Sequence, residues 1–183
     1  MEKVFVLGID GAFPEYIFGE WLDDLPNIKK LIKKGVHAKL NSTIPPLSVT
    51  AWSSIYTGKS PADTGIFEYV YRKNKSYEDI HVVTSKNLKE KTIWEIASEH
   101  NKKSVICYLN LTWPIKPFNG WMVSDSIFGS DKDKYSCVYP KELKEELENF
   151  LGEIPPLDIA DFRDFTKEEI IKEVYKLTEK HID

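Results

Sequence analysis

Cysteine is scarce in this chain of 183 residues, which contains only Cys107 and Cys137. Two cysteines build neither a disulfide scaffold nor a thiolate metal cluster. Cys107 lies within the apolar run 104–109, so we expect a buried thiol there and not a reactive one.

Long apolar runs and a surplus of positive charge are missing too. The chain begins MEKVFVLGID, and this apolar run is too short for a signal peptide or a membrane span. The 25 basic residues are outnumbered by 29 acidic ones, and the formal charge of -4 lacks the basic excess of a nucleic-acid-binding protein. We therefore expect a cytoplasmic protein that binds neither membrane nor nucleic acid.

Histidine offers no metal site by its spacing. The chain has four histidines, and none stands at a metal-ligand spacing from another histidine or a cysteine. We expect each of them to be structural or solvated: His37, His81, His100 and His181.

The residues that are present alternate between strand and helix patterns. Residues 3–9 (KVFVLGI) are apolar at nearly every position, which is typical of a strand buried on both faces of a parallel sheet. Further strands are predicted at 36–40, 79–83, 104–110 and 120–125, and helices at 26–34, 49–56, 91–101, 140–152 and 166–181. This alternation predicts a single α/β domain over residues 1–183, with a largely parallel sheet flanked by helices.

Asp10 stands where the first predicted strand ends, between Gly8 and Gly11. Sites in open parallel sheets form outside the carboxyl ends of strands, and glycines permit close approach of a ligand. The residues alone leave two interpretations open: a functional carboxylate, or a cap of the helix expected to begin near Pro14.

The stretch PLSVTAWSSIYTGKSPADTGIF, residues 46–67, is rich in hydroxyls. Ser53, Ser54 and Thr57 fall inside the predicted helix, where such residues bond to the preceding turn or allow close packing. Ser48 is expected at the N-cap, where a hydroxyl is either a cap or a nucleophile stabilised by free N–H groups. The Gly-Lys-Ser at 58–60 follows a helix and lacks the earlier glycine, so it does not predict a nucleotide phosphate loop.

Four segments together resemble, in order and spacing, the N-terminal half of the alkaline phosphatase superfamily. The similarity is greatest to phosphohydrolases of the type I phosphodiesterase/nucleotide pyrophosphatase kind and covers about residues 3–150. The segments are VLGIDG at 6–11, LPNIKKLIKKGVHAKLNSTIPP at 25–46, SVTAWSSIYTGKSPADTGIFEY at 48–69 and KTIWEIASEHNKKSVICYLN at 91–110. The resemblance implies an alkaline-phosphatase-like core.

The resemblance also implies a site and a mechanism. Asp10 matches the family's metal-binding aspartate, and Ser48 matches its nucleophile, which also touches a metal. Two divalent ions, typically zinc, would flank the phosphate of a small phosphate ester. Ser48 would attack phosphorus in line, and water would then hydrolyse the phosphoserine.

The remaining ligands of the family have no counterpart in the sequence, so we expect the fold and the two-metal site to be incomplete in this chain. Three functions follow as expectations. The first is a metal-dependent phosphodiesterase or phosphomonoesterase completed by residues beyond this chain. The second is an inactive truncated half-domain that acts as a binding or structural module, possible as a homo-oligomer. The third is a phosphomutase.

The polar region 68–90 is the candidate for substrate recognition. Its Tyr69, Tyr71, Arg72 and Tyr77 are of the kinds that stack on or clamp a leaving group. The alternative is that they cover an edge of the sheet.

Overall fold

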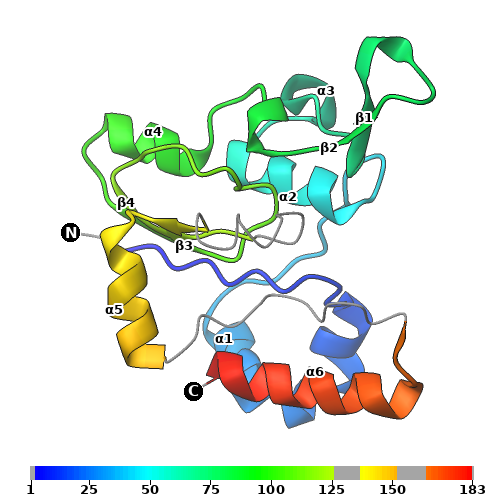
Figure 1. The fold of residues 1–183 in the computed structure, drawn as a ribbon. Coiled ribbons are helices and arrows are strands. Elements are labelled where there is room, and N and C mark those ends of the chain that lie inside the picture. The colour runs from blue at the N-terminus through cyan, green and yellow to red at the C-terminus, as the bar shows by residue number, and fades with distance from the viewer. Residues whose placement is uncertain (1–2, 126–136, 152–163, 183) are drawn as a thin grey trace. The chain divides into compact units, whose positions relative to one another are not determined.

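The computed structural model of the chain describes residues 3–125, 137–151 and 164–182, and it has a mixed α/β architecture (Figure 1). The chain divides into two compact units, Met1–Ser42 and Thr43–Asp183. The prediction of a single domain stays a prediction.

The first unit contains short helical segments. The π-helix η1 (Tyr16–Glu20) and the 3-10 helix η2 (Leu22–Asp24) precede the α-helix α1 (Pro26–Lys34). Proline at the first position of α1 presets the backbone for a helix and has no N–H to leave unpaired. The Gly35 N–H donates to the Leu31 carbonyl at 2.8 Å, so α1 ends where the sequence predicts.

The strands predicted at 3–9 and 36–40 were wrong. Neither segment forms a strand ladder with any described residue, and their apolar side chains are exposed, with Val4 at 88% and Val36 at 99%. A segment forms a strand only where an adjacent segment provides partners for its backbone N–H and C=O groups. The apolar pattern of a buried strand does not supply that neighbour.

The second unit contains a three-stranded sheet with the order β3-β4-β5. Strands β3 (Ser104–Cys107) and β4 (Gly120–Val123) are parallel, and β5 (Val138–Tyr139) pairs antiparallel with β4. Two of the predicted strands are thus confirmed, and one pair is parallel. The first ends earlier than predicted, because Tyr108 has a left-handed backbone with φ 54°.

Helices precede and follow the strands of this sheet along the chain. They are α2 (Ser48–Thr57), α3 (Pro61–Thr64), α4 (Ile93–Glu99), α5 (Glu142–Leu151) and α6 (Lys167–Ile182), with the 3-10 turns η3 (Lys73–Lys75) and η4 (Ser85–Asn87). A capping box begins α6, since the Thr166 N–H donates to Glu169 at 2.8 Å and the Glu169 N–H donates to the Thr166 hydroxyl at 3.3 Å. The other predicted helices are confirmed within a few residues at each end.

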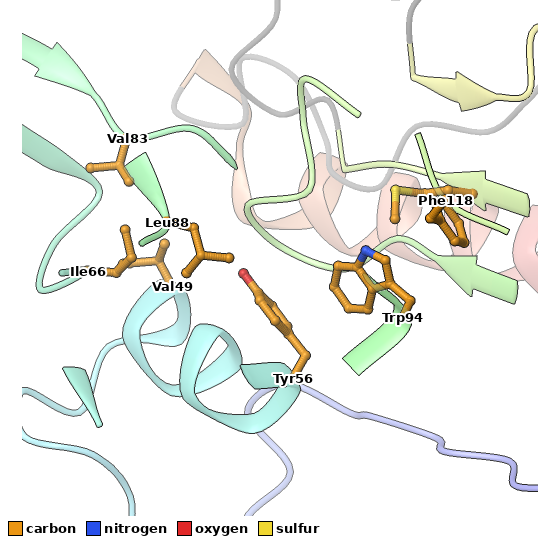
Figure 2. Close-up of a cluster of buried hydrophobic side chains, with 8 residues drawn as sticks. Val49, Tyr56, Ile66, Val83, Leu88, Trp94 and Phe118 are labelled. Atoms are coloured by element: carbon orange, nitrogen blue, oxygen red, sulfur yellow. The ribbon is translucent and has the colours of Figure 1, made fainter. Parts of the chain in front are cut away.

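The core of the second unit is one hydrophobic cluster around α2. Figure 2 shows Val49 and Tyr56 of α2 in this cluster, with Trp94 beside the Tyr56 ring at a centroid distance of 5.0 Å. The remaining buried members are Ile66, Val83, Leu88, Phe118 and Met122. Removal of such side chains from water is the main term that holds α2 in place.

The prediction of a buried Cys107 thiol was wrong, because Cys107 is exposed while Cys137 is buried. Side chains alternate along β3, and Cys107 lies on the same face as the exposed Val105. An apolar run is buried on both faces only when both faces are covered.

We predict that Gly120→Ala lowers the free energy of unfolding by roughly 3 kcal/mol or more. Gly120 has φ 154°, and a Cβ there would lie 1.8 Å from the Ser104 carbonyl oxygen across the β3–β4 pair. The control Gly58→Ala places an alanine in the left-handed conformation, where its Cβ meets no neighbouring atom. It should lower the free energy of unfolding by about 1 kcal/mol. Urea unfolding measures both, and equal costs would contradict the tight β3–β4 approach.

Candidate functional site

Ser48 is the first residue of α2, and Leu47 is the N-cap. The helix therefore begins one residue earlier than predicted, and Ser48 is not the N-cap. The first intrahelical bond runs from the Ala51 N–H to the Leu47 carbonyl at 2.8 Å. Backbone N–H groups before Ala51 have no carbonyl partner within the helix, which makes this end of α2 an anion-binding environment.

The Ser48 side chain is half-buried, and its hydroxyl makes no hydrogen bond within the described part of the chain. Leu47 cannot cap the helix with its side chain, and no cap hydrogen bond is present. The interpretation of Ser48 as a structural cap therefore has no support in the geometry. Its role as a nucleophile stays a prediction.

The other hydroxyls of α2 fall into two groups. Ser53 donates to the Thr50 carbonyl at 2.9 Å, and Thr57 donates to the Ser53 carbonyl at 2.6 Å, which confirms the predicted bonds to the preceding turn. The hydroxyls of Thr50 and Ser54 are buried without a partner among the described residues. A periodicity argument does not reveal this difference, because it depends on which carbonyls neighbouring side chains already occupy.

The Gly-Lys-Ser segment follows a helix, as the sequence predicts, and it leads into the short helix α3, which was not predicted. Gly58 ends α2 in a left-handed conformation with φ 67°. Ser60 is the N-cap of α3, and it forms a capping box with Asp63. The hydrogen bonds from Ser60 lower the pKa of the Asp63 carboxyl.

Asp10 lies in a turn with Gly11, whose φ is 68°. The residue that caps η1 is Glu15, so the interpretation of Asp10 as a cap of that helix is not supported. The Asp10 side chain is exposed. Asp10 belongs to the first unit and Ser48 to the second, and their shared site stays a prediction.

Within residues 3–125, 137–151 and 164–182, no three His, Cys, Asp or Glu side chains are arranged to hold a metal ion. His81 instead pairs with Asp79 at 2.5 Å, and the His37 ring contacts that of Phe18. A cavity of about 20 Å³ beside the Lys116–Glu95 pair has room for a water molecule.

The polar region 68–90 forms a two-stranded antiparallel ribbon of β1 (Val70–Arg72) and β2 (Ile80–Val82), which confirms the strand predicted there. The ribbon is a sheet of its own and does not extend the β3-β4-β5 sheet. The ribbon region contains two ring contacts. The Arg72 guanidinium lies 4.4 Å from the centroid of the Tyr77 ring, and the Tyr71 ring stacks on His81.

The family model of type I phosphodiesterase/nucleotide pyrophosphatase matches residues 4–181. The chain belongs to this family. No curated protein and no solved structure gives a significant match.

Membership of the type I phosphodiesterase family confirms the resemblance found in the sequence. It implies hydrolysis of phosphate esters, and the family is typically metal-dependent. None of the described helices has the length and apolar character needed to cross a membrane.

We predict that Ser60→Ala destabilises this phosphodiesterase-family chain by about 1 kcal/mol, because it removes the cap of α3. Lys59→Ala should change the free energy of unfolding by less than about 0.5 kcal/mol, since the Lys59 side chain is exposed. Its backbone N–H, which donates to the Thr57 hydroxyl, is kept in the variant. Thermal unfolding measures both variants. Equal effects, or tight nucleotide binding lost in Lys59→Ala, would contradict the assignment of this segment as a helix connection.

Proposed function

We propose that the chain supplies the nucleophilic part of a metal-dependent phosphodiesterase or phosphomonoesterase, with Ser48 as the nucleophile. The observation that carries the proposal is the family match over residues 4–181, which includes the hydroxyl-bearing N-terminus of α2. Ser48 supports it as the first residue of α2, because its hydroxyl is not engaged in a cap.

The chemistry assigned to Ser48 is a double displacement. The Ser48 oxygen forms a bond to phosphorus while the bond from phosphorus to the ester oxygen breaks, and the serine proton ends on the departing alcohol. Water then cleaves the phosphoserine and restores the hydroxyl. The free N–H groups at the start of α2 are oriented to donate to phosphate oxygens, whose charge must be stabilised in both steps.

The proposal includes two divalent ions, with zinc as the expected metal and Asp10 and Ser48 among the ligands. The described residues do not complete such a site, because none of their acidic, histidine or cysteine side chains form a cluster of three. One carboxylate and one hydroxyl do not hold two metals.

The same lack of a described ligand cluster favours a second candidate. In that case the chain keeps the fold of the family and acts as a binding or structural module. The two candidates differ in metal content and in turnover.

We predict that Ser48→Ala lowers hydrolysis of bis(p-nitrophenyl) phosphate and p-nitrophenyl phosphate by about 10³-fold or more, because no other described hydroxyl takes its place. Assays with added Zn²⁺ or Mn²⁺ measure this. Ser53→Ala is the matched control in the same helix, and it should keep most of the activity. Hydrolysis that survives in Ser48→Ala would exclude Ser48 as the nucleophile.

We predict that Asp10→Asn weakens zinc binding at least about tenfold, because a neutral amide replaces a carboxylate ligand. Equilibrium dialysis of the full chain against Zn²⁺ measures the affinity without an activity assay. Asp24→Asn, an exposed aspartate of the same unit, is the control and should bind zinc as the unchanged chain does. Identical affinities in all three proteins would remove Asp10 from the metal site.

A further inference from the structure

The β1–β2 ribbon has two faces, and its register assigns each residue to one of them. Tyr71 lies opposite His81 in the ladder. The ladder continues at the base, where the Val83 N–H donates to the Tyr69 carbonyl at 2.8 Å. Because side chains alternate with a period of two, the pairs Tyr69/Val83 and Tyr71/His81 lie on the same face.

This face begins in the hydrophobic core beside α2. Val83 is 7% exposed and belongs to the same buried cluster as Val49, which is 3% exposed. Figure 2 shows Val83, Ile66 and Val49 gathered at one end of α2. Val49 directly follows Ser48, so the base of the ribbon is fixed next to the turn that carries the proposed nucleophile.

One step outward from this base, the face carries two stacked rings. The Tyr71 and His81 centroids lie 5.5 Å apart with an interplanar angle of 27°. His81 Nε2 lies 2.5 Å from the Asp79 carboxylate, which orients the imidazole. Tyr71 is 38% exposed, so a large part of its ring is open to a ligand.

The opposite face provides an internal comparison. Arg72 pairs with Ile80 across the ribbon, and by alternation both point away from the Tyr71–His81 side. Arg72 is occupied with the Tyr77 ring. The face of Tyr71 and His81 is thus the one that continues from Val83 in the core, and Arg72 and Ile80 lie on the other.

We propose that the Tyr71–His81 pair is the specificity-determining element of the Ser48 site and binds a planar ring carried by the phosphate ester. This proposal rests on the proposed function of Ser48. The exposed Tyr71 ring already stacks on the partly buried His81, which Asp79 holds, so the pair needs little ordering to accept a further ring. Asp79 is a positioning residue for His81.

The test is equilibrium binding of phenyl phosphate and methyl phosphate to the full chain in the presence of Zn²⁺, by calorimetry. The two probes share the phosphate and differ in the ring. We expect phenyl phosphate to bind about 5- to 100-fold more tightly, the range for one stacked base. The double variant Tyr71→Thr/His81→Thr should reduce this ratio to within about twofold of one, with the affinity for methyl phosphate unchanged.

The matched control is Arg72→Thr/Ile80→Thr, which replaces the neighbouring cross-strand pair on the other face with the same residues. It should keep the preference for the ring. Equal binding of both probes by the unchanged chain, no binding of either, or a preference that survives in Tyr71→Thr/His81→Thr, overturns the proposal.

Failure of the hydrolase proposal gives a different result. In that case Ser48→Ala hydrolyses the p-nitrophenyl esters as fast as the unchanged chain, or neither protein hydrolyses them, while the ring preference still depends on Tyr71 and His81. A hydrolase that depends on Ser48 but shows no ring preference leaves the proposed function standing and removes the role of the ribbon.

Discussion

The packing of α2 in the hydrophobic cluster is the constraint on which the candidate site depends. Val49 and Tyr56 anchor the two ends of this helix in one core, so the direction of its N-terminus is fixed by side chains that themselves do no chemistry. Tyr56 also donates through its hydroxyl to the Asn110 carbonyl at 3.3 Å, which joins α2 to the loop after β3. Burial raises the pKa of Tyr56, so this hydroxyl keeps its proton and remains a donor across the physiological range.

The same cluster also fixes the ribbon that follows α3. A two-stranded ribbon is only marginally stable alone in water, and here its base is held because Val83 lies within the core. Ser48, the proposed nucleophile, and the stacked rings are thus both next to members of one hydrophobic cluster, although they come from separate parts of the sequence.

Sequence alone predicted the elements that local chemistry determines. The end of α1 before Gly35 and the start of α6 after Thr166 depend on residues a few positions apart, so a local pattern is sufficient to place them. The strands expected at 3–9 and 36–40 depend on a distant neighbour, which no local pattern supplies. The exposed Cys107 has the same cause, because the apolar run around it does not state which faces of β3 are covered. The Tyr71–His81 stack required the register of the ribbon, which a polar and tyrosine-rich composition does not determine.

Charge sets the remaining requirement of the site. A helix N-terminus offers the equivalent of roughly half a positive charge, and a phosphate monoester carries close to two negative ones. The free N–H groups of α2 can orient a phosphate but cannot neutralise its charge. Additional positive charge is therefore needed, which agrees with the typical dependence of the family on metals. The ribbon does not fill this need, because His81 is already paired with Asp79 and the Arg72 guanidinium stacks on Tyr77, on the other face. In the proposed site, Ser48 reacts with the ester and the ring pair selects it, and the cations that permit the reaction need ligands in addition to Asp10 and Ser48.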